Sequence, residues 1–97
     1  MKLSVGDKIF YNGNLCPIEE TNEFSVIIAC QNGLHKSIPL HALEGRTFEW
    51  IVEYHKGNGE KRFNGRSRCD TEEKAKKEKA LMDELKWETT IHIEEKA

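Results

Sequence analysis

The segment Phe24–Cys30, with the sequence FSVIIAC, constrains the fold of this 97-residue chain more than any other part of it. It is β-branched, apolar and almost uninterrupted, a pattern typical of a strand that is buried on both faces. Shortly after it comes Asn32-Gly33, and because both residues tolerate positive φ, the pair predicts a tight hairpin turn. We therefore expect an antiparallel sheet built around this strand.

Turn signals divide the rest of residues 1–44 into shorter strands. The pattern predicts three of them, at Lys8–Tyr11, Leu15–Glu20 and Leu34–Ile38. Pro17 has no backbone N–H for a ladder hydrogen bond, so we expect its strand to lie at a sheet edge. An unpaired edge there would allow two copies of the chain to pair, and the sequence leaves the oligomeric state open.

The order of these elements resembles the layout of an SH3-like small barrel. The segment GDKIFYNG opens a strand, three hairpin-linked strands follow, and the predicted helical turn PLHAL precedes a last strand. The resemblance covers roughly the first half of the chain and includes no motif specific to one family. It implies a small antiparallel barrel or sheet, but barrels of this kind bind peptides, nucleic acids or nothing known, so it transfers no function.

The second half begins with a clear hairpin pattern. Residues 48–55 alternate between apolar and polar side chains, which predicts a strand with one wet face. A glycine-rich turn at 56–59 follows, and residues 60–67 return as the partner strand. We expect His55 to pair with Glu60 across this turn.

That register fixes the neighbours on both faces of the hairpin. On the outer face it places Glu53 opposite Arg62 and Glu49 opposite Arg66. On the inner face it places Trp50 across Gly65, where the missing side chain makes room for an indole. The two arginines are then internally ion-paired.

A helix and a last strand complete the chain. Asp70 with Glu73 three residues later forms a capping-box pattern, which predicts a helix over residues 71–86. Its narrow apolar stripe consists of Ala75, Leu81, Met82 and Leu85. Residues 87–94 alternate as a final strand. The chain is thus expected to be α+β, with a helix packed on a largely antiparallel sheet.

We expect one domain of two halves, a short-strand half at 1–44 and a ββαβ half at 45–97, which share the strand Phe48–His55. Composition favours an intracellular, soluble protein: the net charge is −2, hydrophobic residues make up 37% and charged residues 33%. No stretch approaches the roughly 20 apolar residues of a membrane span. We do not expect the segment MKLSVGDKIF to act as a secretion signal, because it has no long apolar run and no small-residue cleavage site. Three irregularly spaced cysteines are a poor disulfide framework and suit reduced thiols in the cytoplasm.

The one positive functional signal is a cluster of basic residues around the predicted hairpin. Its members are Lys56, Lys61, Arg62, Arg66 and Arg68. Lysines and arginines on one face contact phosphates, and the interleaved Tyr54 and Phe63 are available to stack on bases. The alternative is that the arginines pair with glutamates and the aromatic rings point inward. The cluster suggests a nucleic-acid-binding module that uses this hairpin. We rank this hypothesis second because the chain lacks an overall basic charge.

The leading hypothesis is a small non-enzymatic module that binds a protein, as an adaptor or inhibitor. It follows by elimination, and it assigns contact roles to exposed aromatics such as Tyr11 and Trp87. Cys16, Cys30, His35 and His41 are zinc-ligand types, but they lack the paired spacing of structural zinc sites, so no metal or other cofactor is expected. No nucleophile motif or phosphate loop is present, and we expect no enzymatic activity.

Overall fold

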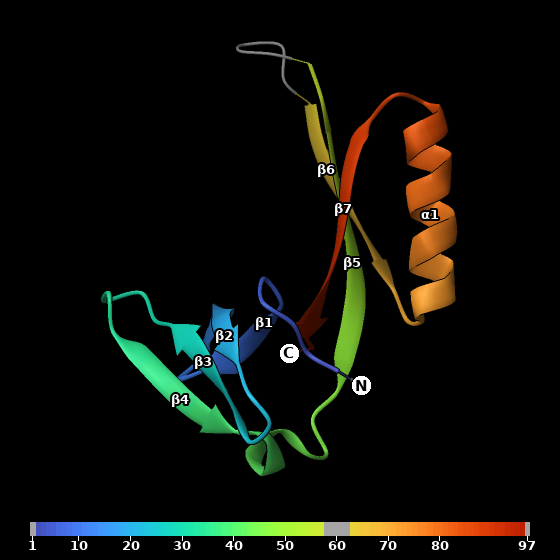
Figure 1. The fold of residues 1–97 in the computed structure, drawn as a ribbon. Coiled ribbons are helices and arrows are strands. Elements are labelled where there is room, and N and C mark those ends of the chain that lie inside the picture. The colour runs from blue at the N-terminus through green and yellow to red at the C-terminus, as the bar shows by residue number, and fades with distance from the viewer. Residues whose placement is uncertain (1, 58–62, 97) are drawn as a thin grey trace. The chain divides into compact units, whose positions relative to one another are not determined.

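The computed structural model describes residues 2–57 and 63–96. Along this part of the chain the elements are β1 (Lys8–Tyr11), β2 (Asn14–Thr21), β3 (Ser25–Ala29), β4 (His35–Pro39), the 3-10 helix η1 (Leu40–Leu43), β5 (Phe48–Lys56), β6 (Phe63–Cys69), α1 (Glu72–Glu84) and β7 (Glu88–Glu95). The strands are hydrogen-bonded in the order β4-β3-β2-β1-β7-β5-β6 (Figure 1). The predicted α+β class is confirmed. The helix α1 is neither long nor apolar enough to cross a membrane.

The chain divides into two compact units. The first unit comprises Met1–Phe48 with Ile93–Ala97, and the second comprises Glu49–His92. β7 therefore contributes residues to both units, whereas the predicted shared strand, β5, contributes only Phe48 to the first. The organisation as a single domain stays a prediction.

In the first unit, alternation along the strands builds the core. The buried side chains are Ile9, Cys16, Ile18, Val26, Ile28 and Leu43. Within β3 only Val26 and Ile28 are fully buried, and Ile27 between them is half-buried on the opposite face. The prediction that Phe24–Cys30 is buried on both faces was therefore wrong. Phe24 precedes β3 and is 79% exposed.

Pro17 lies in an interior strand and not at an edge, which corrects the sequence-based expectation. β2 pairs with β1 on one side and with β3 on the other. The Ile18 N–H donates to the Asp7 carbonyl at 2.8 Å, so the neighbouring Pro17 nitrogen points the other way, toward β3. The aligned pairs of β2 and β3 begin only at Ile18 opposite Ile28, which leaves Pro17 where no ladder donor is needed.

The strands of the first unit do not close into a barrel. Within the described residues, β4 pairs with β3 alone, so the strand order of this unit is open at β4. Pro39 ends this strand, which makes β4 the edge that carries a proline. The predicted edge at Leu15–Glu20 is an interior strand.

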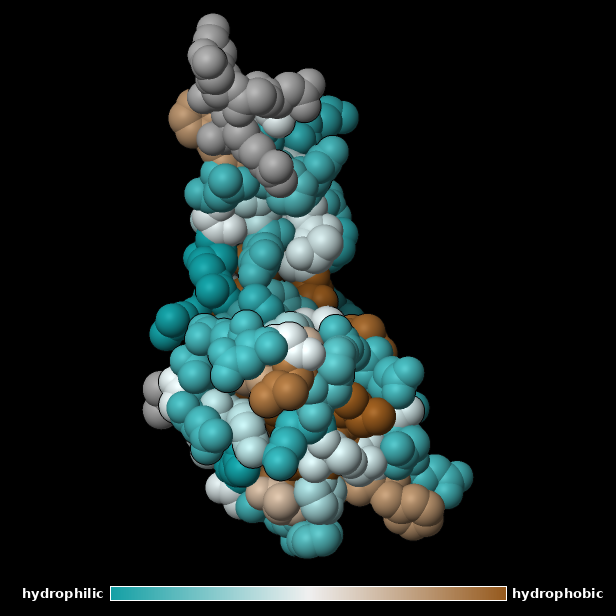
Figure 2. Space-filling model, turned by 90° about the vertical axis from the view of Figure 1, so that its left-hand side faces the viewer, coloured by the Kyte–Doolittle hydropathy of each residue, from teal (hydrophilic) through white to brown (hydrophobic). Residues whose placement is uncertain are grey.

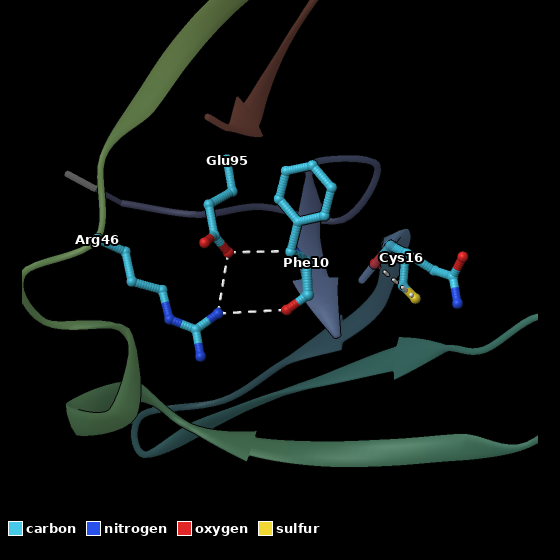
Figure 3. A network of polar contacts seen from close by, with 5 residues as sticks. Phe10, Cys16, Arg46 and Glu95 are labelled. Atoms are coloured by element: carbon cyan, nitrogen blue, oxygen red, sulfur yellow. Dashed lines mark hydrogen bonds and ion pairs between the residues drawn. The ribbon is translucent and has the colours of Figure 1, made fainter. Parts of the chain in front are cut away.

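Carboxylates complete the hydrogen bonding where β7 meets β1. β1 and β7 run parallel, with Lys8 opposite Glu94. The buried Asp7 accepts the Ser4 N–H at 2.7 Å and the Ile93 N–H at 2.8 Å. Glu95 Oε1 accepts the Phe10 N–H at 3.0 Å and Arg46 Nη1 at 2.9 Å (Figure 3). The C-terminal residues are thus held in the first unit largely by side-chain acceptors.

In the second unit, β5 and β6 form a hairpin whose register differs from the predicted one. His55 pairs with Asn64, four residues beyond Glu60. β5 ends at Lys56 and β6 begins at Phe63, and residues 58–62, which include part of the predicted turn, lie outside the described residues. Because the shift is an even number of residues, each side chain keeps its predicted face, but the predicted wet face of β5 is wrong: Glu49 and Ile51 on that face are buried.

The new register changes which aromatic ring covers Gly65. Tyr54 lies opposite Gly65, and a Cβ built on that glycine would lie 2.4 Å from Tyr54 Cε2. Tyr54 also meets Trp87 edge-on, with ring centroids 5.3 Å apart. The predicted device, an aromatic ring seated on a glycine, is present, but Tyr54 fills the role expected of Trp50.

The helix α1 lies beside β6 (Figure 1), and Ser67 on that strand donates to Glu78 Oε1 at 3.0 Å. The N-cap of α1 is Thr71 and not the predicted Asp70. The Thr71 side chain accepts a hydrogen bond from the Lys74 N–H. Ala75 is fully buried and Met82 half-buried. Leu81 and Leu85 are exposed, so the predicted apolar stripe is covered only in part.

We expect Asp7→Ala to lower the free energy of unfolding by about 2–3 kcal/mol, because it leaves two backbone N–H groups without their charged acceptor. Asp7→Asn keeps one acceptor and should lose roughly half as much. Urea unfolding measures both, with the exposed Glu44→Ala as the control. Equal midpoints for Asp7→Ala and Glu44→Ala would show that these hydrogen bonds contribute nothing net.

Gly65→Ala should lower the free energy of unfolding by about 1–3 kcal/mol, because the new methyl group overlaps the Tyr54 ring, which Trp87 restrains. Asn64→Ala, the neighbouring exposed position on β6, is the matched control. Urea unfolding followed by tryptophan fluorescence distinguishes the two. A Gly65→Ala midpoint equal to that of the control would mean that the ring moves aside freely.

Candidate binding sites

An apolar pocket opens in the first unit, with a volume of about 630 Å³. Its apolar walls are Leu3, Val26, Leu40, Leu43 and Phe48. Its polar rim includes Glu23, Glu44 and Arg46. A concave apolar site with a few polar groups at its rim is the usual form of a ligand site.

Two local structures shape this pocket. The turn between β2 and β3 is held by Asn22, whose Oδ1 accepts the backbone N–H groups of Phe24 at 2.8 Å and Ser25 at 2.9 Å. The Leu40 N–H donates to the Phe24 carbonyl at 2.8 Å, which fixes the start of η1 beside that turn. η1 then directs Leu43 into the core, where it is buried, while Leu40 stays 38% exposed.

The rim of the apolar pocket is more acidic than its residue types suggest. Arg46 Nη1 is bound by Glu95 at 2.9 Å and by the Phe10 carbonyl at 3.3 Å, so its charge is already matched (Figure 3). Glu23 and Glu44 are exposed carboxylates among the lining residues, and the exposed Lys2 is a cation among them. With Arg46 bound by Glu95, the pocket combines an apolar floor with a rim on which two carboxylates outnumber one lysine.

Apolar surface is also visible outside the pocket. Phe24 follows the rim residue Glu23 and exposes most of its ring. In the lower part of Figure 2, apolar patches interrupt the hydrophilic surface of the first unit. Larger exposed apolar patches are a feature of interaction sites.

A second cavity of about 410 Å³ in the same unit contains several residues singled out from the sequence. Its lining includes Tyr11, Cys16, Cys30, Leu34, His35 and Lys36, and we call it the cysteine cavity. Tyr11 lies under Lys36, with Nζ 6.0 Å from the ring centroid. His35 Nδ1 lies 2.7 Å from Glu19. Of the four zinc-ligand candidates, His41 lies apart on η1, so the four do not share this cavity.

The basic residues of the hairpin are engaged by neighbours in the second unit. Arg66 Nη2 lies 3.9 Å from Glu53 and Arg68 Nε lies 3.7 Å from Glu49. Lys56 donates to the Leu85 carbonyl at the end of α1, at 3.3 Å. The shifted register gives Arg66 the partner Glu53 in place of the predicted Glu49, and Arg68, for which the predicted register gave no partner, lies near Glu49. Lys61 and Arg62 lie outside the described residues.

Trp87 is a half-buried packing residue. Its ring lies edge-on to Tyr54, and Lys56 Nζ is 5.7 Å from its centroid. The structure therefore places Tyr11 in the first unit and Trp87 in the second, each within its own set of contacts.

The residues of the apolar pocket were not singled out by the sequence. Leu40 and Leu43 belong to the predicted turn PLHAL, and Phe48 begins a predicted strand, so each had a structural explanation. The one available signal was Phe24, a bulky apolar residue directly after the turn residues Asn22-Glu23. The strand prediction had included it, which hid that signal.

Comparison of the chain with protein-family models, with curated proteins and with solved structures gave no match.

We expect labelled single- and double-stranded oligonucleotides to show no binding at near-physiological salt, because the described basic side chains of the hairpin already have partners. Fluorescence anisotropy at low and near-physiological salt measures this. Arg68→Glu alone and Lys56→Glu/Lys61→Glu/Arg68→Glu serve as comparison variants. Micromolar binding that weakens steeply with salt and disappears in the triple variant would instead establish the nucleic-acid hypothesis.

Proposed function

We propose that this chain is a small non-enzymatic module that binds a protein partner through the apolar pocket of its first unit. The observation that carries the proposal is an apolar pocket of about 630 Å³ whose lining includes the half-exposed Leu40 and Glu23, the residue before the exposed Phe24. Exposed apolar side chains at the mouth of a concave apolar surface mark binding sites more often than isolated ones do.

The chemistry of the pocket defines the partner segment that would fit. The apolar walls favour a short extended segment with one bulky apolar side chain. The rim carboxylates Glu23 and Glu44 favour a lysine or arginine next to that side chain, since Arg46 is engaged by Glu95. A site of this size buries little area, so we expect affinity in the micromolar range.

The resemblance of the first half to SH3-like domains is part of this proposal. The first half contains four strands and η1, followed by a further strand, in an open strand order. Domains with this layout include peptide binders, which agrees with an adaptor or inhibitor role. Nucleic-acid binding through the hairpin stays the alternative, and the ion pairs at Arg66 and Arg68 weigh against it.

Selection from a random peptide library, followed by affinity measurement on the enriched peptides, tests the proposal. We expect a bulky apolar residue beside a basic one. Phe24→Glu and Leu40→Glu should each reduce affinity about tenfold or more, because each places a charge against the apolar segment. Glu44→Gln should cost less and should make binding less sensitive to salt.

Leu81→Glu on α1 is the matched control, since it makes the same change at an exposed leucine of the second unit. It should leave affinity unchanged, and amide chemical-shift changes on peptide addition should map to Val26, Leu40 and Leu43. The pocket would be refuted as the site if peptides bound Phe24→Glu, Leu40→Glu and Leu81→Glu with equal affinity. Amide chemical-shift changes confined to the second unit would refute it as well. Failure to enrich any peptide would remove the support for the function itself.

A further inference from the structure

Cys16 on β2 and Cys30, the residue directly after β3, line the same cavity. The aligned pairs of β2 and β3 end with Ile18 opposite Ile28, beside a register shift between Ile18 and Glu20, and continuing that pairing by two residues would bring Cys16 opposite Cys30. Pro17, the residue between Cys16 and Ile18, has no N–H to donate to a ladder. The backbone of Cys30 is fixed by its own turn, since its N–H donates to the Leu34 carbonyl at 2.7 Å.

The type of strand pair at this position suits a disulfide. Both ladder hydrogen bonds of Ile18 go to β1 and its preceding turn: its N–H donates to Asp7 and its carbonyl accepts from Gly6 at 3.0 Å. Ile18 and Ile28 are therefore a non-hydrogen-bonded pair, and Cys16 and Cys30 have the same parity. In such pairs the Cα atoms are about 4.5 Å apart, within the range of about 4.4–6.8 Å that disulfides span.

The two thiols also share their surroundings. Cys16 is 2% exposed within the core of the first unit, and the half-buried Cys30 packs against that same core. Both line the cysteine cavity, which opens to solvent. The third cysteine, Cys69, lies on β6 in the second unit. All three are free thiols in this structure.

We propose that Cys16 and Cys30 form a reversible disulfide that small-molecule disulfides such as oxidised glutathione install through the cysteine cavity. The Cys30 thiolate attacks one sulfur of the oxidant and releases one glutathione thiolate. The Cys16 thiolate then attacks the Cys30 sulfur of the mixed disulfide and releases the second glutathione. Two protein thiols are oxidised and one oxidised glutathione is reduced to two glutathione thiols, whose thiolates take up, through solvent, the two protons that the protein thiols release.

The order of the two steps follows from the surroundings of each thiol. Burial, and then the neighbouring Cys30, raise the pKa of Cys16, so little of it is thiolate at neutral pH. Cys30 is the more exposed of the two and reaches the cavity. Cys30 therefore meets the oxidant first, and Cys16 resolves the adduct.

The expected consequence is a stiffer first unit. The crosslink joins β2 to β3 and closes a short loop that contains the Asn22 turn. Because it restricts the unfolded chain without requiring β2 and β3 to move, we expect Tm to rise by about 10 °C or more on oxidation.

The experiment uses the full chain with Cys69→Ser, which leaves only the proposed pair, incubated in glutathione buffers of graded oxidation. We expect intact mass to fall by two hydrogen atoms, both thiols to become unreactive to alkylation together, and dithiothreitol to reverse both changes. Cys16→Ala should instead accumulate one glutathione adduct at Cys30. Cys30→Ser should react much more slowly, since only the buried Cys16 remains.

Three outcomes would overturn the proposal. They are a stable glutathione adduct in the chain that retains both thiols, oxidation that gives only covalent dimers, and unchanged alkylation under oxidising buffer. Circular dichroism of each variant confirms that it is folded, and Cys30→Ala replaces Cys30→Ser if that variant is not. These readouts do not involve peptide binding, so they test the disulfide proposal independently of the proposed binding at the apolar pocket.

Discussion

The placement of two carboxylates determines how the ends of this chain come together. β7 reaches the first unit only with its last residues and lies parallel to β1, a pairing that offers few ladder hydrogen bonds. Asp7 and Glu95 supply the missing acceptors, since each binds a backbone N–H on the other strand. Charged acceptors form stronger hydrogen bonds than carbonyls do, and Asp7 does so while buried. Residues separated by most of the sequence are thus held beside the core.

The same polar network shapes the proposed binding site. Glu95 binds Arg46 on the rim of the apolar pocket, which removes a positive charge from an otherwise acidic edge. The pocket walls depend in turn on the Asn22 turn and on the hydrogen bond from Leu40 to Phe24. Cys16 lies on β2, and Cys30 directly follows β3. The β2–β3 pair therefore contributes residues to both the apolar pocket and the cysteine cavity, although the two proposals use different residues.

In the second unit, side-chain packing and not turn chemistry distinguishes the observed register of β5 and β6. The glycine-rich segment after residue 56 predicts a hairpin but fits several registers, because a longer connection does not fix strand pairing as a two-residue turn does. Tyr54 over Gly65 and the facing Glu53 and Arg66 agree with the observed register. In this register Arg66 and Arg68 lie near glutamates of β5, while Lys56 donates to the Leu85 carbonyl at the end of α1. These three described members of the basic cluster therefore have partners inside the second unit.

The sequence by itself determined the element types and their order, since alternation and turn residues act locally. The turn Asn12-Gly13, with φ of 51° and 79°, is an example. Tertiary structure alone decided that Pro17 is interior, that Thr71 and not Asp70 caps α1, and that Phe24 is exposed. Each depends on which strand or helix becomes a neighbour. Contacts between residues distant in sequence, such as Arg46 with Glu95, leave no local pattern, so the candidate site emerged only from the folded chain.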